Sequence, residues 1–264
     1  MPQPLSPFIS PSEERHFAGG GEMGELVRSL DWSRTPLGPS RDWPVSLKTM
    51  AGVVLHNRFP MLMWWGPEMI QLYNDAYRPV LGLKHPGSLG APGEQVWQEI
   101  WDVVGPMARG VLNGGPATWS ENLELFINSR GFLEETFHTF SYSPIPDEEG
   151  GVGGVLVTVR ETTQEVQHGR QLRMLRDLAA RSADAKSPEQ ACHTSLNVLA
   201  DNDLDLPFCL LYLLDANGDT ARLAGAAGCP TPSWPRCPRS SPSPPGPART
   251  GPSPRPPGRA TPSW

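Results

Sequence analysis

One stretch of this chain, residues 59–83, restricts the fold more than any other. An apolar run at residues 59–65 has the length of a buried strand, and Gly66-Pro67 ends it at a turn. A second apolar run at residues 69–73 follows at once. Asn74-Asp75 comes next, and its side-chain oxygens are suited to cap a helix. The stretch therefore predicts two paired strands that run directly into a short helix.

Three more strands are predicted where apolar and polar residues alternate. Thr, Phe and Tyr in the second of them suit a half-buried sheet, and the three ranges are 117–127, 132–143 and 152–159. Apolar residues at helical spacing predict helices over residues 22–30, 45–55, 94–105 and 106–112. This order predicts an α+β fold, a five-stranded antiparallel sheet with helices on one face.

Several segments resemble a known family. The hairpin that ends in Asn74-Asp75-Ala76-Tyr77 resembles the start of a PAS sensory domain. Residues 31–39 and 43–47, with Trp, Pro and Gly in a fixed order, resemble the region before PAS domains in a group of bacterial sensor histidine kinases. Arg160-Glu161-Thr162-Thr163 resembles the Asp-x-Thr that closes many PAS domains, with Glu161 at the Asp position. The resemblance covers residues 21 to 229 and implies a PAS-like five-stranded sheet with flanking helices.

The sequence predicts five parts. Residues 1–44 form an N-terminal extension, of which 1–20 are expected to be mobile, and 45–163 form the PAS-like domain. Residues 164–186 form a helical linker. Residues 187–229, with a capped helix, a strand, an Asn-Gly turn and a strand, resemble the incomplete start of a GAF domain. Residues 230–264 hold 13 of the 31 Pro and five Arg, and we expect a disordered tail, either authentic or the product of a shifted reading frame.

Charge and cysteine content exclude several classes of protein. Without residues 230–264 the chain has 17 basic and 28 acidic residues, and this acidic balance argues against a nucleic-acid partner. The four Cys occur singly, as in proteins of a reducing cytoplasm. No apolar run has the length of a membrane span. We therefore expect a cytoplasmic protein without a membrane partner.

The sequence shows no catalytic constellation. His168 lacks the acid and the Pro that follow a phospho-acceptor His, and no nucleotide-binding box follows it. The remaining His have no metal spacing, so no metal is expected. Residues 94–112 contain no His to hold haem, and residues 74–83 contain no Cys for a photoactive flavin. We therefore expect no cofactor and no catalysis in this chain.

Aromatic residues supply the candidate binding site. Seven of the nine Trp lie between Trp32 and Trp119. We predict a pocket for a small apolar or aromatic ligand, lined by Trp65, Tyr73, Trp97, Trp101 and Phe137. The alternative, which we favour because most apolar clusters form a core, is that these side chains only fill the core and dimer cap of a small domain.

The signal would leave through the helix that follows the last strand. Glu161 and Thr163 stand at the exit, and Leu172, Leu175 and Ala179 form a stripe on the helix that predicts a homodimer. The resemblance implies a sensory input module of a two-component histidine kinase, with a response regulator as a partner only through a kinase part that this chain lacks. The alternatives are the input module of another output enzyme, such as a phosphatase or nucleotide cyclase, and a stand-alone dimerisation module.

Overall fold

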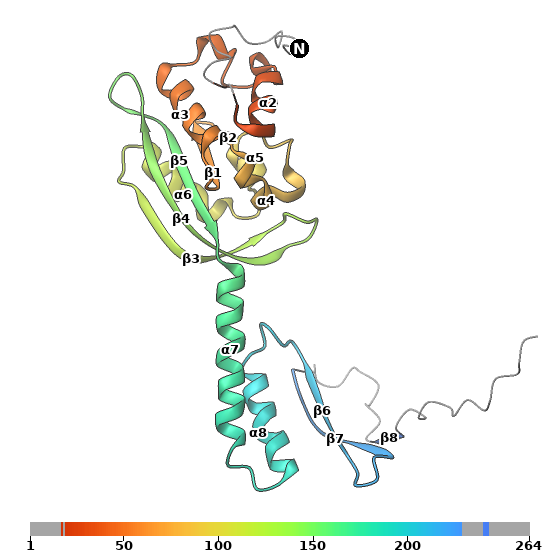
Figure 1. Ribbon diagram of the computed structural model, residues 1–264. Helices are drawn as coiled ribbons and strands as arrows, with labels where there is room; N and C mark the ends of the chain where they lie inside the picture. Colours follow the sequence, from red (N-terminus) through yellow and green to blue (C-terminus); the bar gives the residue numbers. More distant parts are fainter. Residues whose placement is uncertain (1–16, 18, 229–239, 243–264) are drawn as a thin grey trace, which may run out of the picture. The chain divides into compact units, whose positions relative to one another are not determined.

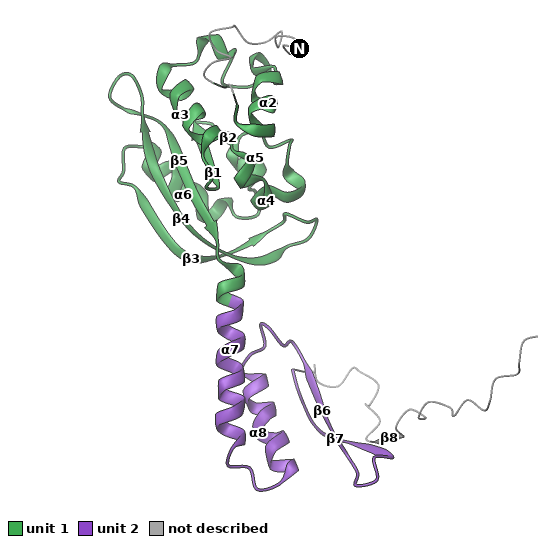
Figure 2. Cartoon of the chain, viewed as in Figure 1, with its two compact units in different colours: residues 1–166 green, residues 167–264 purple. Residues whose placement is uncertain are grey.

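The computed structural model describes residue 17, residues 19–228 and residues 240–242 (Figure 1). The chain divides into two compact units, residues 1–166 and residues 167–264 (Figure 2). The predicted disordered tail lies outside the described residues, except for residues 240–242, which form a strand. Of the predicted mobile lead-in, only residues 17, 19 and 20 are described.

Unit 1 is built on a five-stranded antiparallel sheet, which confirms the predicted fold class. Its strands are β1 (Met61–Trp65), β2 (Ile70–Tyr73), β3 (Thr118–Ile127), β4 (Glu134–Pro146) and β5 (Val152–Glu161). They lie in the order β2-β1-β5-β4-β3, so the first hairpin joins the last strand at the centre of the sheet. The register pairs Leu62 with both Tyr73 and Val157.

Helices and turns connect the two halves of the sheet. After β2 come a 3-10 helix (Asp75–Tyr77), α4 (Arg78–Leu81), a second 3-10 helix (Gly82–Lys84), α5 (Gly93–Val96) and α6 (Trp101–Leu112). The predicted cap at Asn74 is confirmed, because its Oδ1 accepts hydrogen bonds from the backbone N–H groups of Tyr77 and Met61, both at 3.1 Å. Its Nδ2 donates to the carbonyl oxygens of Asn57 at 3.0 Å and Phe59 at 2.6 Å. Asn74 therefore fixes the step from strand to helix.

The N-terminal region packs into the same core. It contains α2 (Gly21–Ser29), two 3-10 helices (Trp32–Arg34 and Ser40–Asp42) and α3 (Val45–His56). The Trp32 and Trp43 rings meet edge to face at 4.7 Å, and the Trp32 Nε1–H donates to the Val27 carbonyl at 2.8 Å. Residue 17 and residues 19–43 thus belong to the folded unit.

Helices cover both faces of the sheet, whereas the sequence predicted helices on one face. Every residue of β2 and four of the five in β1 are buried. In Figure 1 α3 and α6 lie on opposite sides of the sheet, α3 against β1 and β2 and α6 against β4 and β5. Successive strand residues point to opposite faces, so a strand that is buried at consecutive positions needs cover on both.

Unit 2 contains most of α7 (Thr163–Ser182), which begins in unit 1, followed by α8 (Pro188–Ala200), β6 (Cys209–Leu214), β7 (Thr220–Ala227) and β8 (Ser240–Pro242). The predicted cap of α8 is confirmed, because Ser187 Oγ accepts from the Gln190 N–H at 3.1 Å. The predicted turn between β6 and β7 is confirmed as well, and Asp215 accepts from the Asp219 N–H at 2.9 Å there.

Candidate functional site

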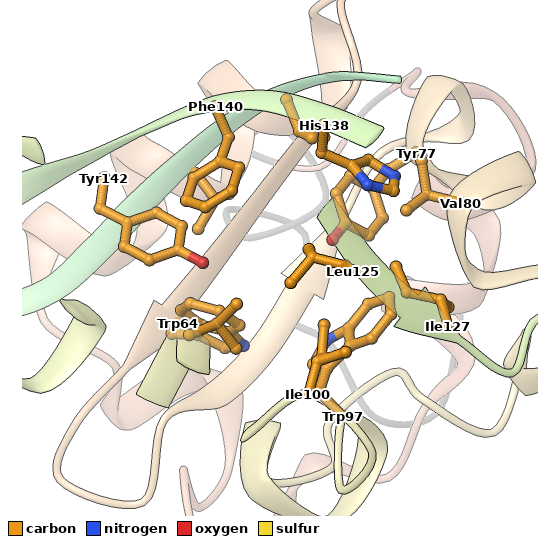
Figure 3. A pocket seen from close by; sticks show the side chains of 13 residues that line it. Trp64, Tyr77, Val80, Trp97, Ile100, Leu125, Ile127, His138, Phe140 and Tyr142 are labelled. Carbon is orange, nitrogen blue, oxygen red and sulfur yellow. The ribbon is translucent and has the colours of Figure 1, made fainter. Parts of the chain in front are cut away.

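A cavity of about 40 Å³ lies between the sheet and the helices that follow β2 (Figure 3). Its walls are apolar and aromatic side chains from β1, β3, β4, β5 and the segment from Tyr77 to α6, and they include two phenols and one imidazole. The lining residues are Trp64, Tyr77, Val80, Trp97, Ile100, Val104, Leu125, Ile127, His138, Phe140, Tyr142, Val157 and Val159.

The three polar side chains are His138, Tyr77 and Tyr142, and each is at least 95% buried. Burial lowers the pKa of His138, against the opposing effect of the Glu161 carboxylate. Burial raises the pKa of both phenols, and the neighbouring Tyr142 adds to the rise at Tyr77. All three groups are therefore neutral near pH 7. His138 Nδ1 is buried and has no hydrogen-bond partner among the described residues.

Gln71, on β2, positions two of the aromatic walls. Its Oε1 accepts hydrogen bonds from the Trp97 Nε1–H at 3.2 Å and the Trp64 Nε1–H at 3.4 Å. The side chain is fully buried, and its Nε2 has no partner among the described residues. One buried amide oxygen thus orients the Trp that faces the cavity from the sheet and the Trp that faces it from the helices.

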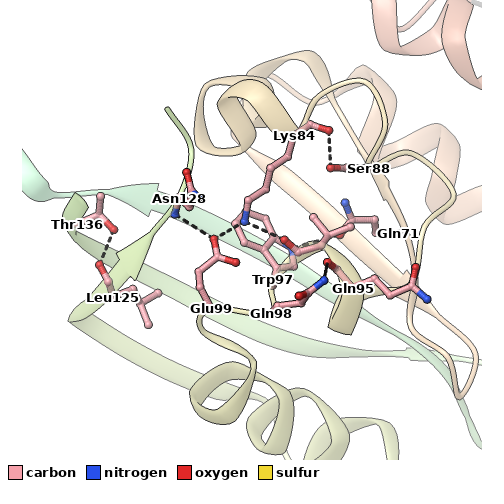
Figure 4. Close-up of polar contacts among 11 residues, drawn as sticks. Gln71, Lys84, Ser88, Gln95, Trp97, Gln98, Glu99, Leu125, Asn128 and Thr136 are labelled. Carbon is pink, nitrogen blue, oxygen red and sulfur yellow. Dashed lines mark hydrogen bonds and ion pairs between the residues drawn. The ribbon is translucent and has the colours of Figure 1, made fainter. Parts of the chain in front are cut away.

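A polar latch holds the other side of Trp97 (Figure 4). The Lys84 Nζ lies 4.4 Å from the centroid of the Trp97 ring, donates to the Val96 carbonyl at 2.8 Å, and forms an ion pair with Glu99. The Glu99 carboxylate also accepts from the Asn128 N–H at 3.0 Å. Burial works to raise the pKa of Glu99, but the hydrogen bonds from Lys84 and Asn128 outweigh it and lower that pKa. The latch joins the helical wall to the end of β3.

Of the five residues predicted to line a pocket, Trp97 lines the cavity and the other four do not. The alternation along a strand explains two of them: Trp65 follows Trp64, and Phe137 precedes His138, so each points to the opposite face. The Trp65 ring lies against Gly153 and Gly154. The Tyr73 hydroxyl forms a hydrogen bond with His85 Nδ1 at 2.9 Å and is not among the groups that line the cavity. Trp101 packs edge to face on Trp64 at 5.8 Å, behind the cavity wall.

The sequence interpretation missed His138, Phe140 and Tyr142 as lining residues. The signal was present, since three residues spaced by two in the predicted strand 132–143 must share a face. Phe137 lies between two residues of that strand that face the other way.

The predicted exit residues meet at the start of α7. The Thr162 N–H donates to the Phe137 carbonyl at 2.7 Å, and the Phe137 N–H donates to Thr163 Oγ1 at 3.0 Å. The Thr163 hydroxyl in turn donates to Glu161 Oε1 at 2.9 Å. Glu161, although one methylene longer than Asp, thus makes a local hydrogen bond at the exit, and β4 clamps the first residues of the helix.

The predicted stripe on α7 is open to solvent. Leu172 is 67% exposed and Leu175 is 56% exposed, and Ala179 is exposed as well. No residue of α7 is buried. In unit 2 the helix is tied by an ion pair between Arg170 and Asp205 at 2.9 Å.

No protein-family model and no curated protein matches the chain. Among solved structures, the chain is similar to a sensory box sensor histidine kinase from Vibrio cholerae, with 14% identity, a TM-score of 0.30, and coverage of 39% of this chain and 77% of that chain. It is also similar to the PAS domain of Bordetella pertussis BvgS, with 18% identity, a TM-score of 0.33, and coverage of 49% of this chain and 96% of that chain. A third similar structure is a Rhodobacter sphaeroides LOV protein, with 12% identity, a TM-score of 0.37, and coverage of 58% of this chain and 92% of that chain.

The fold of unit 1 is PAS-like. This assignment rests on the strand order and the helices between β2 and β3. Within the described ranges, no helix is long and apolar enough to cross a membrane, and no group of three or more His, Cys, Asp or Glu side chains is placed to hold a metal ion.

Proposed function

We propose that unit 1 is a sensory input module that detects a change in its core cavity and passes it to α7. One observation carries the proposal: the cavity and the exit share consecutive residues of β4. His138 faces the cavity, while the backbone of Phe137 holds both Thr162 and Thr163. Glu161 is the register partner of His138 and also accepts from Thr163.

The coupling has a simple physical basis. A peptide segment that holds its neighbours by two hydrogen bonds cannot shift at one residue without straining the next, because the backbone between them has only two soft dihedral angles per residue. A change in the side chain of His138 therefore alters the position of Phe137, and with it the first turn of α7. A two-state response requires that the signal bind one arrangement better than the other.

We further propose that the output is a histidine kinase joined to the end of a helical linker, as the sequence resemblance implies. A different output enzyme would receive the signal through the same start of α7. A stand-alone dimerisation module would need no output enzyme. Phosphotransfer from labelled ATP, assayed on the natural gene product that contains this region, separates the first proposal from the other two.

The exposed stripe on α7 supports the proposal that the chain forms a homodimer through this helix. Burying Leu172 and Leu175 against a second copy would contribute about 1.5–3 kcal/mol for each fully buried side chain. Sedimentation of the wild-type chain and of Leu175→Glu tests this: we expect a dimer that the charged variant dissociates. A monomer in both cases would contradict it.

The test of the sensory proposal perturbs the cavity and observes the exit. Val157→Ile adds one methyl group to the cavity wall. We expect changed hydrogen exchange at the Thr162 and Val166 amides, which bond to the carbonyl oxygens of Phe137 and Thr162. Amide exchange resolved by NMR measures both.

The control is Val53→Ile, which adds the same methyl group on the exposed side of α3. It should leave exchange at Thr162 and Val166 unchanged. If Val157→Ile shifts the NMR signals of the cavity-lining methyl groups but leaves both amides as in the wild type, the cavity is not coupled to the helix and the proposal is wrong.

A further inference from the structure

We infer that the cavity binds a neutral molecule of three to four non-hydrogen atoms with one hydrogen-bonding oxygen, the class of short alcohols, aldehydes and ketones. The inference rests on the proposed sensory function and names the kind of ligand. It departs from the sequence-based expectation of an apolar or aromatic ligand, because different residues line the cavity.

The polar side chains of the cavity favour a ligand with a hydrogen-bonding oxygen. In Figure 3 the phenol oxygens of Tyr77 and Tyr142 point toward the middle of the cavity, and the imidazole of His138 lies beside Tyr77 at its edge. Neither phenol oxygen is hydrogen-bonded to another described residue, and His138 Nδ1 has no partner among them either. The His138 Nδ1 atom is buried without a partner, which destabilises the folded state. A ligand oxygen near the phenols could accept a hydrogen bond from Tyr77 or Tyr142, since a phenol can donate.

The volume of the cavity limits the size of the ligand. A cavity needs at least about 10–15 Å³ to hold one water, and the cavity of about 40 Å³ therefore has room for a small molecule. Each water there would need about two to four polar partners. Because the indole N–H groups of Trp64 and Trp97 already donate to Gln71, the cavity supplies three other polar side chains, and its remaining walls are apolar. One oxygen attached to two or three carbons satisfies both kinds of wall.

The lining of the cavity favours a neutral ligand. None of the lining residues is Asp, Glu, Lys or Arg. The nearby carboxylate of Glu161 acts electrostatically on His138 and would repel an anion. Moving an isolated ion into such a site costs far more than its hydrogen bonds return. A carboxylate or ammonium ligand is therefore excluded.

Three probes of one shape test the inference on the full chain: acetone, acetate, and 2-methylpropene, which has a CH₂ group in place of the ketone oxygen. Binding is followed by NMR from the methyl signals of Ile100, Leu125 and Val157. We expect acetone to give saturable shifts and acetate to bind at least tenfold more weakly. Tyr142→Phe should weaken acetone by about threefold to tenfold, the worth of one neutral hydrogen bond, and should not weaken 2-methylpropene.

Tyr77→Phe is a second variant with the same expected effect, in case Tyr142→Phe does not fold. Tyr212→Phe, which removes a hydroxyl from unit 2, is the matched control and should leave acetone affinity unchanged. Equal binding of acetate and acetone, acetone affinity that is indifferent to both cavity variants, or acetone shifts that never saturate would each overturn the inference. A failure here with a positive exchange result for Val157→Ile would remove the ligand class and leave the sensory proposal standing.

Discussion

Replacing Gln71 by Met should destabilise unit 1, because one amide oxygen serves two buried indoles. Met has nearly the same length and shape as Gln and cannot accept a strong hydrogen bond. In the variant, the Nε1–H groups of Trp64 and Trp97 both lose their acceptor. The hydrogen bonds made by the Gln71 backbone with Ala91 and Gly90 are unaffected, so the change acts on the side chain alone.

The size of the effect follows from three contributions. Each indole N–H that is left unpaired in the core costs about 1–3 kcal/mol. The Trp64 bond, at 3.4 Å, is longer than the usual 2.7–3.2 Å and contributes less than the Trp97 bond at 3.2 Å. Against these losses, removing the unpartnered Gln71 Nε2 returns about 1–3 kcal/mol. We expect a net loss of about 1–3 kcal/mol in the free energy of unfolding.

A double-mutant cycle isolates the hydrogen bonds. Urea unfolding followed by far-UV circular dichroism gives the free energies for Gln71→Met, Trp97→Phe and the double variant. We expect a coupling energy of about 1 kcal/mol between Gln71 and Trp97, and less than half of that between Gln71 and Trp64 in the equivalent cycle with Trp64→Phe. Coupling of zero in both cycles, or a stronger coupling to Trp64, would refute this assignment of the contacts.

Three further predictions follow from other contacts. The pKa of His138 is lowered in the folded state, so the unfolded state binds more protons, and stability should fall as pH drops below about 6.5. The variant His138→Gln should therefore show a smaller change of unfolding free energy with pH between pH 7.5 and 5. An unchanged pH dependence would contradict burial of the neutral imidazole. Lys84→Met should cost about 1–3 kcal/mol in urea unfolding by leaving Glu99 without its cation, and adding Glu99→Gln should recover part of the loss; no recovery would mean that the ion pair is not the cause. Gly154→Ala should cost about 1–3 kcal/mol, since its Cβ would lie 2.6 Å from the Trp64 carbonyl oxygen and 2.8 Å from the Trp65 ring, and a melting temperature equal to that of the wild type would show that the sheet can yield there.

The sequence was sufficient for the elements whose cause is local. The hairpin at residues 59–73, the Asn74 cap and the strands after residue 117 depend on alternation, turn residues and a short-range hydrogen bond, and all of them are confirmed. The five-stranded antiparallel sheet follows from their order. These features require no knowledge of which residues meet across the core.

The site depended on information that the sequence pattern did not supply. An apolar run such as Met63-Trp64-Trp65 is buried on both faces, so hydrophobicity does not say which Trp faces the cavity. That choice is made by α3 covering one face and α6 the other, and these are contacts between distant residues. The role of Gln71 was equally hidden, because a single buried Gln looks like any polar residue until its two indole partners are known.

The central claim is that the cavity and the start of α7 are coupled, and coupling between sites is reciprocal. The most direct measurement is the pKa of His138, read from its ring signals by NMR in the wild type and in Thr163→Val. Loss of the Thr163 hydroxyl frees the Glu161 carboxylate and loosens the clamp on Phe137. The freed Glu161 carboxylate stabilises the charged imidazolium of His138. Water that reaches the ring through the loosened contact stabilises it as well.

We therefore predict a His138 pKa below its ordinary value of about 6.5 in the wild type, and a higher pKa in Thr163→Val. Thr220→Val in unit 2 should leave it unchanged. The same His138 pKa in the wild type and in Thr163→Val would contradict the coupling of cavity and helix.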